Sequence, residues 1–271
     1  MLSWVDGSPA DGLSVRDRGL AYGDGLFETI AVRAGKPRLL ARHLARIGEG
    51  GRRLRLPLPL DLIEQELLAF CATLNEGVAK LLLTRGDGLR GYAIAADAPV
   101  RRILLGSPAP AYPPGNAEQG VVIFPCATRL AEQPLLAGLK HLNRLEQVLA
   151  RAEWSDPAIA EGLMRDGSGR VVEGVFSNLF LAAGGQLVTA ELGRCGVAGV
   201  MRAEVIERAR AAKIPLAIRD VDYDELLRAD EVFLCNSLYG IWPVRRLAEH
   251  SWPVGPLTRK LQANLREFLD F

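Results

Sequence analysis

The sequence predicts an α/β protein with two domains, a smaller N-terminal one and a larger C-terminal one. Three observations support this prediction. The chain has 271 residues, of which 49% are hydrophobic, and this is enough for buried cores. Strand-like and helix-like segments alternate along the chain, and proline and glycine gather in the stretch SPAPAYPPGNAEQG. We therefore expect α/β domains at residues 1–106 and 121–271, joined by an interdomain linker at 107–120.

The expected N-terminal domain begins with a turn and a strand. In LAYGDGLFETIAVR, at residues 20–33, two glycines precede a run of residues suited to a strand. A helix that ends at a glycine follows, and a second helix is expected to begin at a capping box formed by Asp61 and Glu64. Further strands are expected at 79–84 and 102–105. The apolar stripe of the first helix consists of Leu40, His43, Leu44 and Ile47.

The expected C-terminal domain begins with the strand GVVIFPCATR and a loop that ends at Lys140. A helix is expected to start around Asn143 and Glu146, and two strands are expected in VVEGVFSNLFLAA. Gly199 opens a further helix that runs to about Lys213, and DEVFLCNSLYGIWPV predicts a strand and a turn. The stripes expected to be buried are Leu145, Val148, Leu149 and Ala152 in the first helix, and Leu257, Leu261, Leu265 and Phe268 in a terminal helix.

Charge and composition argue against several classes of protein. Lys and Arg number 33 against 32 Asp and Glu, so a net charge of +1 offers no broad surface for nucleic acid or an anionic membrane. The four cysteines and three histidines lack metal-ligand spacing, and no apolar run approaches the roughly 18 residues of a membrane span. The N-terminus has no signal-peptide pattern. We expect a cytoplasmic protein without metal, nucleic-acid or membrane partners.

Lys140 is the first candidate for chemistry because it lies in a loop between an apolar strand and an amphipathic helix. The chain has five lysines against 28 arginines. A lysine held in a desolvating pocket has a lowered pKa, and its neutral amine can attack an aldehyde to form a Schiff base. On position alone, a surface lysine near a helix start remains the simpler interpretation.

Glu173 is the second candidate because it lies within the apolar stretch VVEGVFSNLFL. A buried carboxylate requires a cationic or hydrogen-bonding partner. A protonated pyridine nitrogen would be such a partner, and the pair would keep the ring acting as an electron sink. The alternative is a glutamate at a strand edge that faces water.

The start of the helix at Gly199, Val200 and Met201 is a candidate anion site, since free backbone N–H groups and the helix dipole favour a phosphate there. Ser237 and Asn236 lie in the turn after a predicted strand and could add donors. Glycine before a helix is also common in ordinary turns. Arg46, on the first long helix, could bind the same phosphate or could be a solvated helix arginine.

The segment RGDGLRGY presents Arg90 and Tyr92 together in a loop punctuated by glycines. An arginine with a phenol nearby suits a substrate carboxylate. A solvated turn is the alternative.

These strings resemble, in order and spacing, the fold-type IV pyridoxal-phosphate enzymes, and within them most closely the aminodeoxychorismate lyases. The resemblance covers residues 1 to about 250. The strings that carry it are RDRGLAYGDGLFET, RHLARI, RGDGLRGY, GLKHLNRLEQVLARAE, VVEGVFSNLFL, GVAGVMR and NSLYGIWPV.

The resemblance implies that Lys140 carries pyridoxal 5′-phosphate as an internal aldimine, and that Glu173 pairs with the pyridine nitrogen. It implies a homodimer whose active site lies between the two domains and near the subunit interface, with the loop of Arg90 and Tyr92 contributed by the neighbouring subunit. Phe27 joins that loop as a substrate contact. The phosphate would be held by Arg46, the backbone at Gly199, Val200 and Met201, and Ser237, with Asn236 as a further candidate.

Two departures favour the lyase reaction within this family. Branched-chain aminotransferases have a tyrosine a few residues after the lysine, where this chain has Leu142 and Leu145. D-amino-acid aminotransferases have Arg-x-His where this chain has Arg90, Gly91 and Tyr92. The implied reaction converts 4-amino-4-deoxychorismate into 4-aminobenzoate and pyruvate in folate biosynthesis, with Lys140 as the base. An aminotransferase of the same fold, or an arginine-rich binding protein without activity, is the alternative.

Overall fold

The computed structural model describes residues 2–88, 91–94 and 99–269 and divides into two compact units. The first comprises Met1–Ala111 together with Leu139–Asn143, and the second comprises Tyr112–Gly138 together with Arg144–Phe271. The chain therefore passes from one unit to the other within the predicted linker at 107–120. The short segment that contains Lys140 is grouped with the first unit, although it lies in the 121–271 region of the sequence.

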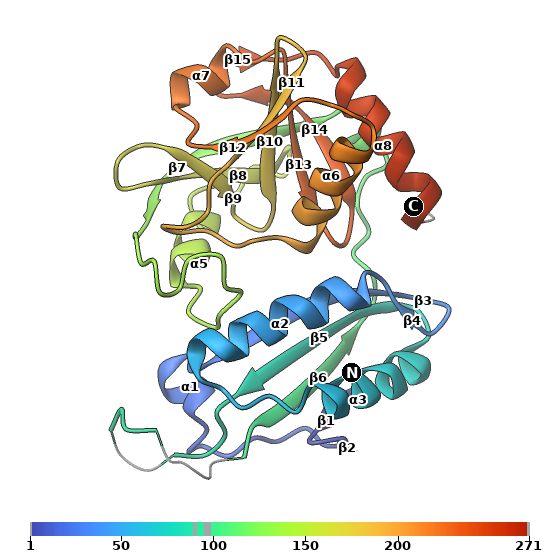
Figure 1. Cartoon of the computed structure of the whole chain (residues 1–271), viewed down its shortest axis with the longest axis vertical. Coiled ribbons are helices and arrows are strands. Elements are labelled where there is room, and N and C mark those ends of the chain that lie inside the picture. The colour runs from blue at the N-terminus through green and yellow to red at the C-terminus, as the bar shows by residue number, and fades with distance from the viewer. Residues whose placement is uncertain (1, 89–90, 95–98, 270–271) are drawn as a thin grey trace. The chain divides into compact units, whose positions relative to one another are not determined.

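The first unit is a six-stranded antiparallel sheet with two long helices over one face (Figure 1). The strand order is β2-β1-β6-β5-β3-β4, and the longest strand of this sheet, β3, pairs with the whole of β5. The strands are β1 (Ser3–Val5), β2 (Ser8–Pro9), β3 (Gly25–Arg33), β4 (Lys36–Pro37), β5 (Gly77–Thr84) and β6 (Arg101–Ser107), and the helices are α1 (Arg18–Tyr22), α2 (Leu40–Leu54) and α3 (Leu60–Leu74).

Alternation along β3 fixes which side chains face the helices. Ile30 and Val32 are fully buried in a core shared with Ile47 of α2 and Phe70 of α3. Glu28 is buried as well, at the position two residues before Ile30. Because side chains two apart on a strand share a face, the hydrophobic pattern turns this carboxylate toward α2.

Two predicted features of these helices are wrong. The first helix does not end at a glycine but continues past Gly48, Gly50 and Gly51 to Leu54. Its glycines allow close packing: a Cβ atom on Gly50 would lie 2.7 Å from Cδ1 of Leu26. The capping box is absent as well, because α3 begins after Pro59 with no side-chain cap, which leaves Asp61 inside the first turn.

The second unit contains a nine-stranded sheet in which β9 pairs with both β8 and β10, so β10, β13, β14, β7, β8 and β9 close into a barrel. The closing contact is the register pair of Glu173 and Asn178. The strands are β7 (Val121–Leu130), β8 (Ile159–Asp166), β9 (Val171–Gly174), β10 (Asn178–Ala183), β11 (Gln186–Ala190), β12 (Leu216–Arg219), β13 (Glu231–Asn236), β14 (Gly240–Leu247) and β15 (His250–Ser251). The helices, labelled in Figure 1, are α4 (Gly115–Glu118), α5 (Leu145–Arg151), α6 (Val200–Ala211), α7 (Tyr223–Leu227) and α8 (Pro256–Leu269).

The expected apolar stripe of α5 is wrong. Leu145, Val148 and Leu149 are exposed by 75%, 61% and 61%, Ala152 is exposed too, and the buried residue of this helix is Ala150. Helical spacing defines a common face but not what covers it. The helix begins after Arg144 rather than at Asn143, and the Glu146 carboxylate accepts the Ala131 N–H at 2.8 Å instead of capping the helix.

The terminal helix follows its predicted pattern where its side chains are described. Leu261 and Leu265 are buried and Leu257 is half-buried, whereas the side chain of Phe268 lies outside the described part of the structure. Within residues 2–88, 91–94 and 99–269, no helix combines the length and the apolar character needed to cross a membrane.

Candidate active site

Lys140 lies on a short segment that extends the sheet of the first unit. The Phe27 N–H donates to the Lys140 carbonyl at 2.9 Å, and the Leu142 N–H donates to the Gly25 carbonyl at 3.0 Å. The Lys140 side chain is half-buried, and its Nζ atom lies 4.4 Å from the centre of the Phe27 ring. Two residues singled out from the sequence, Lys140 and Phe27, are thereby brought together, and the amine is partly shielded from water.

The residue two positions before Lys140, Gly138, belongs to the barrel unit. The Gly138 N–H donates to the Gly196 carbonyl at 2.8 Å, and the Ala198 N–H donates to the Gly138 carbonyl at 3.0 Å. Lys140 is two residues from Gly138, so chain connectivity keeps their Cα atoms within about 7 Å of each other. The intervening Val197 is the residue that contacts Glu173.

Glu173 is a buried acceptor at the point where the barrel closes. Its Oε2 atom accepts the Val197 N–H at 2.8 Å and the Asn178 side-chain amide at 3.3 Å, and the residue is only 3% exposed. A glutamate at a water-facing strand edge is therefore excluded. The guanidinium of Arg144 interacts with the negative charge of Glu173, which raises the pKa of Arg144. Burial of Arg144 has the larger effect and lowers its pKa.

Asn178, which the sequence analysis missed, joins Glu173 to the start of α6. Its Oδ1 atom accepts the Gly199 N–H at 3.1 Å, and its Nδ2 atom donates to the Val197 carbonyl at 2.9 Å. A Cβ atom on Gly199 would lie 2.0 Å from that Oδ1 atom, so glycine permits this close approach. The sequence signal that could have identified Asn178 is a polar residue at the start of an otherwise apolar strand.

The first turn of α6 is suited to an anion. Gly199 precedes the helix with an extended backbone and makes no side-chain capping bond. The N–H groups of Val200 and Met201 lie in the first turn, where no helical carbonyl can accept them. The twelve-residue helix directs its positive end toward the same place. These features would allow the helix start to bind an anion.

The turn after β13 brings Ser237 close to the closing pair in the sheet register, since Cys235 pairs with Asn178. The side chain of Asn236 makes its hydrogen bonds to the backbone of this turn and of Phe176. Its Oδ1 atom accepts the N–H groups of Leu238 and Tyr239 at 2.9 and 3.1 Å, and its amide donates to the Phe176 carbonyl at 3.4 Å. Ser237 is half-buried.

Arg46 is bound to the buried carboxylate of Glu28. Its Nε atom donates to Glu28 Oε1 at 2.7 Å, a second guanidinium nitrogen bonds Oε2, and His43 Nδ1 lies 2.6 Å from the same oxygen. Burial opposes ionisation of Glu28, but the charge of Arg46 and the hydrogen bonds from both partners lower its pKa from 4.5 to about 2. Burial lowers the pKa of His43. A solvated helix arginine is thus excluded, and the guanidinium is held in place.

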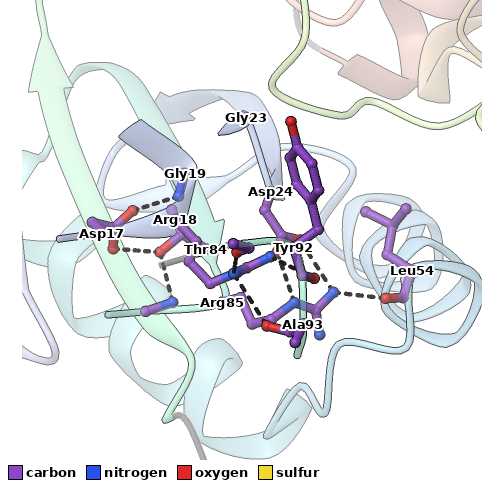
Figure 2. Close-up of polar contacts among 12 residues, drawn as sticks. Asp17, Arg18, Gly19, Gly23, Asp24, Leu54, Thr84, Arg85, Tyr92 and Ala93 are labelled. Carbon is purple, nitrogen blue, oxygen red and sulfur yellow. Dashed lines mark hydrogen bonds and ion pairs between the residues drawn. The ribbon is translucent and has the colours of Figure 1, made fainter. Parts of the chain in front are cut away.

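Of the expected carboxylate-binding pair, Arg90 lies outside the described residues and Tyr92 is 84% exposed. The backbone around Tyr92 is held by Arg18, a buried residue that the sequence analysis missed (Figure 2). The Arg18 guanidinium donates to the carbonyls of Gly91, Tyr92 and Ala93 at 3.1, 3.4 and 3.4 Å, and its Nε atom donates to Asp24 at 2.9 Å.

Asp24 in turn anchors Arg18 to the body of the first unit. Its carboxylate also accepts Arg85 Nε at 2.8 Å, and Arg85 donates to the Leu54 carbonyl at the end of α2 at 2.8 Å (Figure 2). Burial of Asp24 would raise its pKa, but Arg85 and Arg18 lower it, so the group stays ionised. The phenol of Tyr92 lies beside Tyr22, with ring centres 5.3 Å apart.

Comparison with known proteins identifies the family. The model for class IV amino-transferases matches residues 25–247, a span that includes Lys140, Glu173 and the start of α6. The chain belongs to the class IV aminotransferase family. Members of this fold-type IV family use pyridoxal phosphate, and the mixed α/β fold with an N-terminal sheet and a C-terminal barrel confirms the predicted fold class.

Individual members of the class IV family match nearly the whole chain. A structure of 4-amino-4-deoxychorismate lyase from Pseudomonas aeruginosa shares 71% identity, with a TM-score of 0.99 and full coverage of both chains. An aminodeoxychorismate lyase of Vibrio harveyi is 38% identical over 269 residues, which cover 97% of this chain and 98% of that protein. A branched-chain aminotransferase structure from Thermoproteus uzoniensis shares the fold at 22% identity and a TM-score of 0.85, covering 98% of this chain and 93% of its own.

The ionised Glu28 predicts a specific loss of stability in acid. Because its pKa is lowered from 4.5 to about 2 in the folded protein, its stabilising contribution is complete above pH 4.5 and is lost as the pH falls toward 2. The difference in free energy of unfolding between the parent protein and Glu28→Gln should narrow over that interval. Urea unfolding at a series of pH values measures it.

Glu49→Gln provides the control for this acid titration. Glu49 lies on the same helix and pairs with Arg52, but its side chain is exposed. Its effect on the free energy of unfolding should be small at every pH. A constant difference between the parent protein and Glu28→Gln from pH 4.5 to 2 would contradict the assignment.

Proposed function

We propose that the chain is a pyridoxal-phosphate-dependent lyase that converts 4-amino-4-deoxychorismate into 4-aminobenzoate and pyruvate for folate biosynthesis. The observation that carries the proposal is the 71% identity, over the full length of both chains, to the Pseudomonas aeruginosa 4-amino-4-deoxychorismate lyase. The chemistry of Lys140, Glu173 and the first turn of α6 supports it independently. The four cysteines are free and buried, which suits a reducing cytoplasm.

The residues fit pyridoxal phosphate by their donor set. Lys140 offers a partly shielded amine for the aldehyde, and Glu173 offers a buried carboxylate for the pyridine nitrogen. For the phosphate, the first turn of α6 offers backbone N–H groups without a side-chain cap. The groups assigned to the phosphate are the backbone at Gly199, Val200 and Met201, the side chains of Ser237 and Arg46, and the Asn236 turn that presents Ser237.

When bound, the cofactor withdraws electrons from the carbon that carries the substrate amine and so makes its C–H bond acidic. Lys140 Nζ, as a free amine beside the substrate, would take the proton from C4 as the general base. Glu173 holds the pyridine nitrogen in its protonated state. As the C–O bond to the enolpyruvyl group breaks, its electron pair leaves with oxygen and the ring becomes aromatic. Lys140 then returns a proton to the leaving group, which departs as pyruvate.

The substrate contacts are assigned to Phe27, Arg90 and Tyr92. The Phe27 ring lies against the Lys140 amine and supplies an apolar wall where a cyclic substrate can lie. Arg90 and the phenol of Tyr92 are assigned to a substrate carboxylate. The three carbonyl contacts of Arg18 support this role, because they hold the backbone that presents Tyr92.

A homodimer is part of the proposal. Leu145, Val148 and Leu149 form an exposed apolar surface on α5, and in the first unit Val15 and Leu20 are exposed by 86% and 68%. Apolar surfaces of this kind on soluble enzymes mark contacts with other chains. The partner on these surfaces is a second copy of this chain, because the loop that carries Arg90 and Tyr92 is expected to serve the active site of the neighbouring subunit.

The assay of Lys140→Ala tests the proposed chemistry. The parent protein, supplied with chorismate, glutamine and the partner synthase, should release 4-aminobenzoate, and the variant should lose at least about 1,000-fold in turnover because it lacks the base and the amine. Lys260→Ala, which removes an exposed lysine of α8, should keep full turnover. Unchanged turnover in Lys140→Ala would overturn the assignment.

A second assay, with D-alanine or L-leucine as the amino donor and 2-oxoglutarate as the acceptor, separates the competing reactions. If the parent protein transfers amino groups from D-alanine or L-leucine to 2-oxoglutarate but releases no 4-aminobenzoate, the chain is an aminotransferase and the lyase proposal is wrong. Absorbance of the purified protein provides the cofactor readout. A protein that stays colourless with added pyridoxal phosphate would contradict the cofactor assignment.

Val148→Asp tests the homodimer. A charge in the exposed apolar surface of α5 should shift the mass measured by light scattering from that of two chains to that of one, and turnover should fall with it. Leu68→Asp, at a residue of α3 that is 42% exposed, should leave both unchanged. A parent protein with the mass of a single chain and full activity would contradict the proposal.

A further inference from the structure

Glu161, on β8, is fully buried and has no role in the chemistry assigned above. Its carboxylate accepts four hydrogen bonds. Oε1 accepts the N–H groups of Gly162 and Val175 at 2.9 and 3.1 Å, and Oε2 accepts the Phe176 N–H at 3.3 Å and the Ser177 hydroxyl at 2.7 Å. Three of these four donors belong to one short loop, residues 174–177, whose first residue is also the last of β9.

This loop connects the two residues that close the barrel. Glu173 precedes it on β9, and Asn178 follows it on β10. The loop is compact, since the Gly174 N–H donates to the Ser177 carbonyl at 2.8 Å. A Cβ atom on Gly174 would lie 2.3 Å from the Ser177 hydroxyl oxygen, so the loop leaves no room for a side chain at that position. The Glu161 carboxylate is therefore the centre around which the loop is folded.

The position of this loop determines the position of both ends of the proposed cofactor site. Glu173 is assigned to the pyridine nitrogen, and Asn178 bonds both Glu173 and Gly199 at the start of α6. A shift of the loop would move the ring carboxylate and, through Asn178, the amides assigned to the phosphate. Burial raises the pKa of Glu161 to about 8 against the effect of its hydrogen bonds, so the carboxylate that accepts all four bonds predominates above that pH.

We propose that Glu161 is a positioning residue whose carboxylate holds residues 174–177, so that Glu173 and Asn178 meet the cofactor at the pyridine nitrogen and at the start of α6. This inference rests on the proposed function for the identity of the cofactor. Above pH 8, glutamine cannot replace the ionised glutamate, because its NH₂ group would face the Phe176 N–H, and two donors repel each other.

Glu231 provides a matched control in the same barrel. It is 6% exposed and accepts the N–H groups of Leu257 and Thr258 at 3.0 and 2.7 Å and the Thr258 hydroxyl at 2.7 Å. It pairs with Ala182, four residues along β10 from Asn178, and its partners lie at the start of α8. Glu231→Gln thus makes the same chemical change to a buried carboxylate without touching the loop at 174–177.

The experiment compares Glu161→Gln and Glu231→Gln in the full-length chain at about pH 9, where Glu161 is ionised. In the cofactor-free protein, hydrogen exchange at the Val175 and Phe176 amides should rise at least about tenfold in Glu161→Gln, while Leu257 and Thr258 stay protected. Glu231→Gln should show the reverse. After loading, only Glu161→Gln should raise the Kd for pyridoxal 5′-phosphate and lower kcat, each by about tenfold, with the KM for aminodeoxychorismate within about twofold.

The outcomes separate this inference from the proposed function. Wild-type Kd and kcat in a folded Glu161→Gln protein, or equal losses in both variants, would overturn the positioning role. A parent protein that binds the cofactor but releases no 4-aminobenzoate would overturn the lyase reaction, while a selective effect of Glu161→Gln on the Kd would still support the positioning role. If Glu161→Gln does not fold, Ser177→Ala removes one of the four bonds, and it should weaken cofactor binding about threefold; an unchanged Kd there contradicts the inference.

Discussion

Closure of the C-terminal barrel between β9 and β10 is the constraint on which the rest of the site depends. The closing contact is a single register pair, Glu173 and Asn178, and a hydrogen bond between their side chains reinforces it. Asn178 also bonds the N–H of Gly199, so the same pair determines where α6 begins. Val197 bonds Glu173 and pairs with Gly138, two residues before Lys140. A carboxylate, a helix start and the approach to an amine are thus linked by backbone and side-chain hydrogen bonds.

The two kinds of cationic side chain serve different purposes in this arrangement. Arg46 and Arg18 make permanent, geometrically defined contacts, one with the Glu28 carboxylate and the other with three loop carbonyls. A guanidinium keeps its charge and presents several donors in a plane, which suits both contacts. The proposed chemistry requires an amine that can lose its proton, and lysine supplies it. A composition of 28 arginines and five lysines is therefore compatible with a single reactive amine.

Much of the fold and part of the site could be predicted from the sequence, because the signals are local. The strand after Gly25, the helix after Gly199 and the burial of Glu173 follow from glycine positions and from runs of apolar residues within a few positions. Lys140 was singled out by its place at a junction between elements. The family's strings then assigned roles to these residues.

The remainder depends on partners that are distant in the sequence. Arg18 bonds carbonyls that lie 73 to 75 residues away, and Thr84 bonds Asp17 across 67 residues, so neither contact leaves a local pattern (Figure 2). The face of α5 was misjudged because periodicity cannot say whether a stripe meets the core of its own chain or another surface. The glycines of α2 resemble the end of a helix until the packing against Leu26 is known.

Reduction of the cofactor-loaded protein with borohydride, followed by peptide mapping, tests the central claim most directly, because it identifies the amine that holds the cofactor. The account predicts a stable phosphopyridoxyl group on one peptide, the one that contains Lys140. A label on the peptide of Lys36, Lys80, Lys213 or Lys260 instead, or no label on a protein that releases 4-aminobenzoate, would contradict it.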